Sequence, residues 1–175
     1  DIPTLQEYIG YCLIPSNKGQ RMMVIKGSGG EGKSQIGAVL SALFGSNMKD
    51  GSIGKVSIDR VSLSCKVYEG ATDSSMSKGA GHYTSSGIYT GNIGLFGHNR
   101  GSYAYFAKLK NVKIGDIVEY KTAIGTKTYQ VTFVGSISCT DYSYLNEMGD
   151  NRITLITCIA NQPSLRLCVQ AVEIR

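Results

Sequence analysis

The sequence lacks several features that mark common classes of protein. No stretch approaches the ~20 apolar residues that a membrane-spanning helix needs, so we expect no membrane segment in this chain. Its five cysteines contain no close pair, which argues against a dense disulfide framework and against a zinc site of the CxxC kind. The basic residues are scattered without an aromatic platform, so we expect no nucleic-acid partner. Asp1 is not followed by the basic start of a secretion signal, and we expect the chain to begin within a longer reading frame.

The chain is long and apolar enough to fold. Its 175 residues are 42% hydrophobic, and its 22 glycines and 11 tyrosines favour a β-rich body with tight turns. Helical and strand patterns alternate over residues 1–50, whereas residues 51–175 contain short β-prone runs separated by Gly, Asn, Asp and Ser. We therefore predict a small α/β segment over residues 1–50 and a mainly β domain, a barrel or a sandwich, over residues 51–175. The predicted strands of this domain are residues 53–58, 61–68, 92–97, 116–121, 127–138, 153–158 and 166–173.

One motif in the first segment indicates nucleotide binding. Residues 27–34, GSGGEGKS, fit the P-loop pattern GxxxxGK[ST] between a predicted strand and a predicted helix. Backbone N–H groups around Gly27 and Gly32 would surround phosphate oxygens. Lys33 would reach the β- and γ-phosphates, and Ser34 would hold Mg²⁺. Only one helix follows, and no acidic strand of the Walker B kind is present, so we expect a truncated remnant without ATPase activity.

Residues 1–55 resemble the start of the ATPase domain in phage-type helicase-primases. The resemblance is carried by IPTLQEYIGY at residues 2–11, by the P-loop and by LFGS at residues 43–46. The later Walker B, sensor and arginine-finger elements of that family have no counterpart here. The resemblance therefore implies at most binding of ATP and Mg²⁺ at the P-loop remnant, without hydrolysis or DNA unwinding.

Three chemically reactive side chains lie at the ends of predicted strands. Cys158 ends one β-prone run, Arg166 opens the next run eight positions later, and His98 follows an apolar run upstream. If the runs around Cys158 and Arg166 are neighbouring antiparallel strands, the thiol and the guanidinium lie at the same end of a sheet. With a histidine nearby they would form a thiol acyl-transfer site. The strand pattern alone also fits an inert buried cysteine and a surface arginine, and His82 is the second candidate histidine.

Residues 51–175 resemble the catalytic domain of sortases, the cysteine transpeptidases of Gram-positive cell surfaces, and most closely the clostridial class D or class B-like members. The resemblance is carried by the order of a strand that ends in Gly-His, a TLITC strand and a strand that opens on arginine. It implies a closed β-barrel for this domain. The matching segments are Val67-Tyr68-Glu69-Gly70, Lys78-Gly79-Ala80-Gly81-His82-Tyr83, Gly97-His98-Asn99, Leu109, Gly115-Asp116, Thr154-Leu155-Ile156-Thr157-Cys158 and Arg166-Leu167-Cys168-Val169-Gln170-Ala171.

The sortase resemblance implies a role for each of the three reactive residues. Cys158 would attack the Thr–Gly carbonyl of an LPxTG-like sorting signal and form a thioester. His98 would protonate the leaving amine and then deprotonate the incoming amine. Arg166 would bind the substrate and stabilise the tetrahedral oxyanion through charge-assisted hydrogen bonds.

Residues near these three are expected to support them. Asn99 and Thr157 would lie around the catalytic residues or at the rim of the site. His82 is expected in a glycine-rich loop, as a structural residue or a substrate contact, and Cys168 as a core or rim thiol. We predict no metal site, because the acidic residues before the cysteine strand are read as a solvated loop. These acidic residues are Asp141, Glu147 and Asp150.

The resemblance also implies partners and a location. No cofactor would be required, and the partners would be the sorting signal of a surface protein and an amine acceptor, either a peptidoglycan precursor or a pilin-like lysine. Sortases normally act at the extracellular face of the cell membrane and carry an N-terminal anchor, whose place is taken here by residues 1–50. A chain made as written would therefore stay in the cytoplasm. Two alternatives stay open: a nucleotide-binding module, and a folded but inactive chimera.

Overall fold

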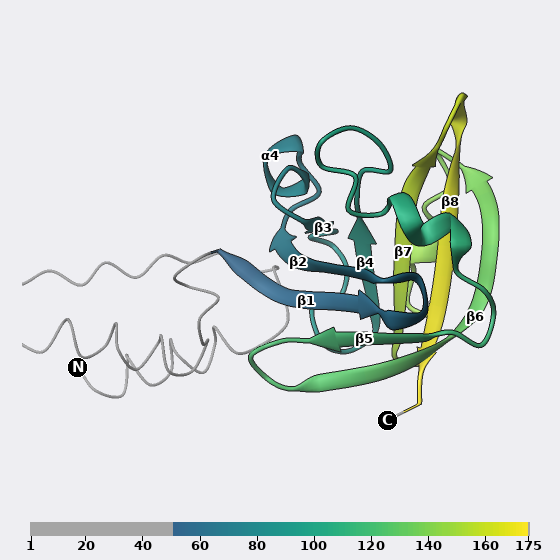
Figure 1. The fold of residues 1–175 in the computed structure, drawn as a ribbon. Coiled ribbons are helices and arrows are strands. Elements are labelled where there is room, and N and C mark those ends of the chain that lie inside the picture. Colours follow the sequence, from purple (N-terminus) through teal and green to yellow (C-terminus); the bar gives the residue numbers. More distant parts are fainter. Residues whose placement is uncertain (1–50, 175) are drawn as a thin grey trace, which may run out of the picture. The chain divides into compact units, whose positions relative to one another are not determined.

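Eight strands close into one barrel in residues 51–174, the part of the chain that the computed structural model describes (Figure 1). The predicted P-loop segment, including Gly27, Gly32, Lys33 and Ser34, lies outside the described residues, and the division at residue 50 stays a prediction. The strands are β1 (Ser52–Ile58), β2 (Leu63–Glu69), β3 (Ala80–His82), β4 (Asn92–Phe96), β5 (Ile117–Lys121), β6 (Thr126–Ser138), β7 (Arg152–Ile159) and β8 (Gln162–Glu173). The short helices are η1 (Asp59–Val61), α4 (Asp73–Met76), η2 (Ala107–Asn111) and η3 (Ser143–Leu145).

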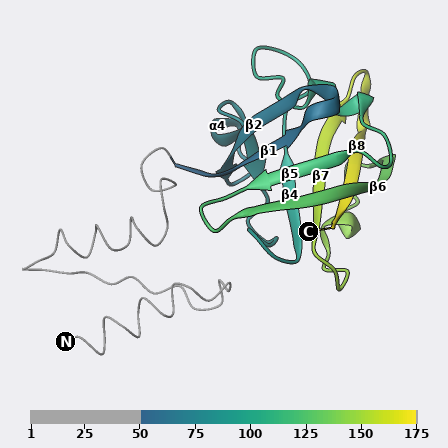
Figure 2. The same ribbon diagram turned by 60° about the horizontal axis from the view of Figure 1, so that its bottom comes forward.

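The strand order around the barrel differs from the order in the sequence. Going around, the strands are β1, β2, β3, β4, β7, β8, β6 and β5, and β5 pairs with β1 to close the barrel. Figure 2 shows β1, β5 and β6 side by side on one wall. The pairs β2–β3 and β4–β7 are parallel, and the other six are antiparallel. The β4–β7 pair joins the strand before His98 to the strand that carries Cys158.

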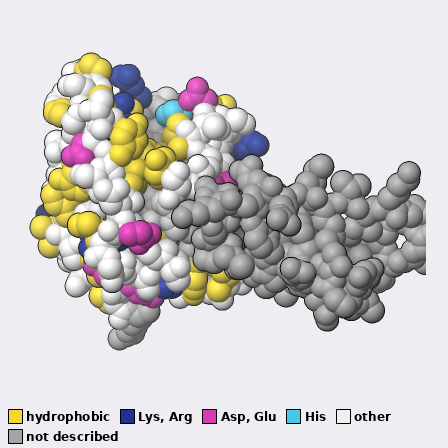
Figure 3. All heavy atoms as spheres, turned by 180° about the vertical axis from the view of Figure 1, so that it is seen from behind, with side chains coloured by type: hydrophobic (Ala, Val, Ile, Leu, Met, Phe, Trp, Pro, Cys, Tyr) yellow, Lys and Arg dark blue, Asp and Glu magenta, His cyan; other side chains and the backbone are white. Residues whose placement is uncertain are grey.

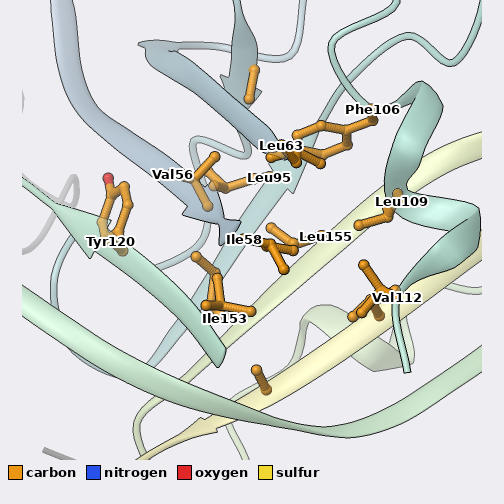
Figure 4. Packing of buried hydrophobic residues seen from close by; sticks show 14 of the residues in the cluster. Val56, Ile58, Leu63, Leu95, Phe106, Leu109, Val112, Tyr120, Ile153 and Leu155 are labelled. Atoms are coloured by element: carbon orange, nitrogen blue, oxygen red, sulfur yellow. The ribbon is translucent and has the colours of Figure 1, made fainter. Parts of the chain in front are cut away.

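Strand alternation separates a main core from a second apolar cluster. The inward residues of β7, Ile153 and Leu155, are fully buried in the main core with Val56 and Ile58 of β1 (Figure 4). The next residue along β7, Ile156, points to the other face, because successive side chains in a strand alternate between faces. There it belongs to a second cluster, which we call the outer cluster: Ile137, Leu145, Ile156 and Cys168, with Tyr83, Phe96, Phe133 and Tyr144 packed against it.

The prediction of a mainly β, closed barrel is confirmed for the described residues, with local differences. Residue 61 closes the short helix η1, so β2 begins at Leu63 instead. The strand β8 begins four positions earlier than predicted, at Gln162. The strand β3 was not predicted, because three residues that include Gly81 carry too little alternation to indicate a strand. Among the described residues no helix has the length and hydropathy needed to cross a membrane.

Candidate active site

Cys158 lies near the end of β7 with an exposed thiol. In the β7–β8 pair Cys158 lies directly opposite Arg166. Two residues earlier on β7, on the same face of the sheet, Ile156 lies opposite Cys168. Cys158 is exposed and free, whereas Cys65 and Cys168 are free and buried. The sequence-based expectation that the thiol and the guanidinium lie at the same end of a sheet is therefore correct.

His98 lies beside Cys158 on the opposite side from Arg166. The parallel register of β4 and β7 runs to Phe96 opposite Ile156, and two further residues along each strand bring His98 level with Cys158. The backbone keeps this alignment beyond β4, because Gly97 N–H donates to the Ile156 carbonyl at 3.2 Å. Neighbouring strands lie about 4.8 Å apart. His98 thus follows the end of β4, whereas Cys158 and Arg166 lie on β7 and β8, and Figure 1 shows these three strands side by side.

Gly97 is required where the chain passes the barrel core next to His98. A Cβ at this position would meet the ring of Phe106 at 2.7 Å, closer than side-chain atoms approach one another. Phe106 itself is fully buried, and its N–H donates to the His98 carbonyl at 2.9 Å. This packing explains the Gly-His order in the sequence: the glycine admits the aromatic ring, and the histidine is held half-exposed beyond it.

Arg166 is held at the end of the β7–β8 hairpin by backbone carbonyls. The register passes from Cys158 opposite Arg166 directly to Ile159 opposite Gln162, so residues 163–165 bulge out of the β7–β8 pairing. One terminal nitrogen of Arg166 donates to the carbonyls of Pro163 at 2.9 Å and Leu165 at 2.8 Å. The guanidinium is half-buried and retains donors for a further acceptor, because an arginine carries five N–H groups.

Two side chains join the His98 segment to the Cys158 strand. The buried hydroxyl of Thr157 donates to the Gly97 carbonyl at 2.6 Å, and the side-chain amide of Asn99 donates to the Cys158 carbonyl. Both residues were expected near the catalytic groups, and the structure places both there. Both bonds end on backbone carbonyls, so the two side chains are connected to Cys158 and His98 through the backbone.

An apolar surface with aromatic walls adjoins the three reactive residues. The outer cluster lies directly below Cys158 and Arg166 on the same face. The ring of Tyr83 meets Phe96 edge-on with centroids 6.1 Å apart, and Phe133 stacks on Tyr144 at 5.3 Å. Figure 3 shows hydrophobic side chains gathered beside a histidine on the face opposite to that of Figure 1. An extended peptide could lay apolar side chains on this surface while a carbonyl reaches the thiol.

A buried polar network fixes the loop between β6 and β7 over this face. Asn92 at the start of β4 donates through its side-chain amide to the carbonyls of Tyr144 at 2.9 Å and Asn146 at 2.8 Å. Its amide oxygen accepts from the Thr154 hydroxyl at 2.8 Å, and Gln170 donates to the same Tyr144 carbonyl at 2.9 Å. This network was not predicted. The signal for it was a polar residue directly before or between apolar residues in each of three strands: Asn92 in β4, Thr154 in β7 and Gln170 in β8.

His82 is not part of the row of reactive residues. The expectation that it lies in a glycine-rich loop is wrong, because it ends β3 and is 1% exposed. Its Nδ1 lies 3.1 Å from a Glu69 carboxylate oxygen, and its Nε2 lies 2.9 Å from the Gly87 carbonyl and 3.1 Å from Ser86 Oγ. A burial this complete leaves almost no surface for a substrate contact.

The arrangement of Ser86, His82 and Glu69 has the connectivity of a serine–histidine–acid triad but not its chemistry. A nucleophilic serine must donate its proton to the histidine. The Ser86 hydroxyl instead donates to the Tyr83 carbonyl at 2.7 Å and accepts from Gly94 N–H at 3.0 Å. Its single proton is thus already used, and His82 Nε2 must donate to it and to the Gly87 carbonyl. These bonds tie the loop after β3 to the barrel, which is a structural role.

Burial and hydrogen bonds shift the pKa of several other ionisable side chains of the described residues. Burial raises the pKa of Cys65 and of Cys168 to about 12, so both stay protonated at neutral pH. Hydrogen bonds from Ser143 lower the pKa of Asp141, and those from Arg152 lower the pKa of Asp150. In residues 51–174 no three His, Cys, Asp or Glu side chains are grouped so that they could hold a metal ion.

A cavity of about 340 Å³ lies away from the reactive row. It is lined by residues of β1, η1 and β5 and contains the ion pair of Arg60 with Asp116, whose closest atoms are 2.5 Å apart. None of its lining residues is a thiol or an imidazole. The lining of this cavity therefore shares no residue with the row of His98, Cys158 and Arg166.

The fold and the site together define a closed β-barrel with a cysteine–histidine–arginine site. A family model described as the Sortase domain matches residues 56–174, and the chain belongs to the sortase family. The chain is 29% identical over 110 residues to sortase A of Bacillus anthracis and 30% identical over 112 residues to sortase A of Listeria monocytogenes. These alignments cover 62% and 63% of this chain but only 52% and 50% of the relatives, so the chain spans about half of their length.

Solved structures show the same barrel. A lid mutant of Streptococcus agalactiae sortase C1 superposes with a TM-score of 0.68 at 26% identity, covering 72% of this chain and 71% of that chain. Listeria monocytogenes sortase A superposes with a TM-score of 0.66 at 26% identity, covering 72% of this chain and 89% of that one. The family match begins at residue 56 and does not extend to the predicted P-loop.

Proposed function

We propose that this chain is a cysteine transpeptidase that cleaves a sorting signal of a surface protein and transfers it to an amine. The observation that carries the proposal is the row formed by Cys158 on β7, Arg166 opposite it on β8, and His98 just beyond the end of β4. The row combines a nucleophile, a proton carrier and a fixed cation, the three parts that acyl transfer through a thioester requires. Membership of the sortase family supports the same reading.

The first half-reaction forms the thioester. The Cys158 thiolate attacks the scissile carbonyl carbon, and the carbonyl electrons move to the oxygen. The Arg166 guanidinium donates hydrogen bonds to this oxyanion, an interaction that strengthens as charge develops. The C–N bond then breaks, and His98 gives its proton to the leaving amine.

The second half-reaction returns the enzyme to its starting state. An incoming amine attacks the thioester carbonyl while His98 accepts a proton from it. The C–S bond breaks, the Cys158 thiolate leaves and a new amide is formed. The proposed steps use only side chains of this chain and call for no cofactor.

The proposed substrate is an LPxTG-like signal, and the proposed acceptor is an amine of a peptidoglycan precursor or a pilin-like lysine. The apolar surface formed by the outer cluster beside Cys158 supports an extended peptide with apolar side chains before the scissile bond. We propose the extracellular face of the cell membrane as the place of action. Both proposals rest on membership of the sortase family.

The nucleotide-binding alternative is less favoured. The sortase match covers the barrel, and the residues that would bind ATP and Mg²⁺, among them Lys33, lie outside the described residues. A nucleotide titration of the whole chain with Lys33→Ala as control tests this alternative separately. Saturable binding that disappears in the variant would support a nucleotide site in addition to the barrel.

Incubation with LPxTG-like peptides and an amine acceptor tests the proposed function. Mass spectrometry of the intact protein is expected to show a peptide adduct on Cys158 and a transpeptidation product in solution. Cys158→Ala should abolish both, whereas Cys139→Ala, a thiol outside the reactive row, should retain both. His98→Ala should slow adduct formation strongly. A folded protein with an alkylatable Cys158 that forms no adduct with any peptide of the set would favour the inactive chimera.

A further inference from the structure

The backbone pairing of β4 with β7 stops one rung before it would reach Cys158. The last backbone bond runs from Gly97 N–H to the Ile156 carbonyl at 3.2 Å. In a regular parallel ladder the next donor on this strand is the backbone N–H two residues later, at Asn99, and its acceptor is the Cys158 carbonyl. The structure fills this rung with a side chain, because the amide of Asn99 donates to the Cys158 carbonyl.

The substitution of a side chain for a backbone rung allows the chain to leave the sheet directly after His98. The His98 carbonyl already accepts from Phe106 N–H at 2.9 Å, so the backbone turns away from β7 toward η2. The four residues that follow Asn99, residues 100–103, are all exposed and offer little packing to hold the segment. Asn99 is therefore the attachment on the far side of His98, and the bond from Thr157 to the Gly97 carbonyl at 2.6 Å is the attachment on the near side.

We infer that Asn99 is a positioning residue that sets the spacing between the His98 imidazole and the Cys158 thiol. This inference rests on the proposed function, in which His98 moves a proton at Cys158 and at the amine. Asparagine suits the position because it combines a short side chain with an N–H donor. Aspartate has the same shape but would place an oxygen against the carbonyl, and alanine has no donor. Glutamine keeps the donor on a side chain that is one methylene longer.

Steady-state kinetics of the full chain test the inference. Asn99→Ala is expected to lower kcat by ~10- to 100-fold, the penalty of a misplaced catalytic group, with KM changed by less than about twofold. Asn99→Asp should lose as much or more, and Asn99→Gln should recover part of the loss. The pH profile of kcat/KM should change with Asn99→Ala, because the histidine would meet the thiol and the amine at altered distances. Ser102→Ala, in the same exposed loop, is the matched control and should leave all these values unchanged.

A double-mutant cycle separates positioning from a general loss of stability. If Asn99 acts through His98, Asn99→Ala should cause no further loss of kcat in the His98→Ala background. An equal loss in both backgrounds would overturn the inference, as would an unchanged kcat and pH profile in Asn99→Ala. The inference would also be overturned if Asn99→Asp and Asn99→Gln lost kcat equally and the loss of kcat simply tracked the fall in their melting temperatures.

The rate of Cys158 alkylation by iodoacetamide gives a readout that needs no peptide substrate. Asn99→Ala is expected to change this rate and its pH dependence in the same direction as His98→Ala does. Failure of the wild-type chain to form a thioester would count against the proposed function alone. Alkylation of Asn99→Ala that matches the wild type while His98→Ala differs would count against the positioning role alone.

Discussion

Replacing Asn92 by alanine should release the loop that borders the active site. The Asn92 side chain is fully buried and makes three hydrogen bonds, to the carbonyls of Tyr144 at 2.9 Å and Asn146 at 2.8 Å and from the Thr154 hydroxyl at 2.8 Å. A typical buried bond contributes about 1 kcal/mol, so loss of all three removes about 3 kcal/mol. The Thr154 hydroxyl can still donate to the Tyr144 carbonyl at 3.2 Å, so its loss of Asn92 adds no further penalty to the free energy of unfolding. We expect the free energy of unfolding to fall by about 2–4 kcal/mol.

Urea unfolding measures this loss directly, and limited proteolysis shows where it acts. The loop of residues 139–151 should be cleaved earlier in Asn92→Ala than in the wild type, because its anchoring carbonyls have lost their donor. In transpeptidation the variant should show a raised KM, since the loop lies over the face that carries Cys158. The matched control is Asn146→Ala, the same chemical change at an exposed side chain of the loop, which should alter the free energy of unfolding by less than about 0.5 kcal/mol.

One outcome would refute the reasoning. If Asn92→Ala lost less than about 1 kcal/mol and its loop were cleaved no faster than in the wild type, the network would not be what holds the loop. A large loss of stability with unchanged cleavage of residues 139–151 would assign Asn92 to the barrel itself.

Three further predictions follow from the site and the ion pairs. Iodoacetamide at about pH 8 should label Cys158 well before Cys168, because Cys158 is exposed and burial raises the pKa of the Cys168 thiol to about 12. Peptide mapping checks the order of labelling, and faster labelling of Cys168 would contradict the described packing. Arg166→Ala should lower kcat by about 100- to 1,000-fold while alkylation of the Cys158 thiol is retained. Arg166→Lys should recover only part of this kcat, since lysine lacks the planar guanidinium fork, and a lysine variant as active as the wild type would argue against oxyanion binding. The hydrogen bond from Arg60 lowers the pKa of Asp116 below its ordinary 3.8, so this pair stabilises the fold fully above about pH 5 and less as the pH falls through the folded-state pKa. Asp116→Asn should therefore show a smaller loss of unfolding free energy between about pH 7 and pH 3 than the wild type, and an equal loss would contradict the assignment.

Most strands and the pairing of Cys158 with Arg166 could be predicted from the sequence for a physical reason. β4 and β7 contain short, mainly apolar runs bounded by turn residues, and such runs indicate a buried strand. Cys158 and Arg166 are joined by a hairpin with a short turn, so their sequence spacing almost determines their pairing. The expected row of thiol and guanidinium follows from these local features.

Other parts of the site depend on contacts that no local pattern reports. The alignment of His98 with Cys158 comes from a parallel pairing across some 60 positions, and sequence resemblance rather than periodicity pointed to it. The side chain of Asn92 is polar in an apolar run, which signals burial with partners but does not say that those partners are carbonyls of a distant loop. β3 was missed and His82 was misplaced because three residues are too few to show a period.

The position of β7 between β4 and β8 links assembly of the proposed site to completion of the barrel. Cys158 and Arg166 both lie on the β7–β8 hairpin, the last two strands in chain order, whereas His98 follows β4, whose edge toward β7 stays unpaired until β7 is added. Pairings between strands so distant in the sequence form slowly, because the intervening chain must first be ordered. During synthesis an incomplete chain therefore holds an imidazole without a thiol beside it. The three residues of the proposed site come together in the same step that closes the barrel, so a partly folded molecule has no assembled site that could react with other proteins.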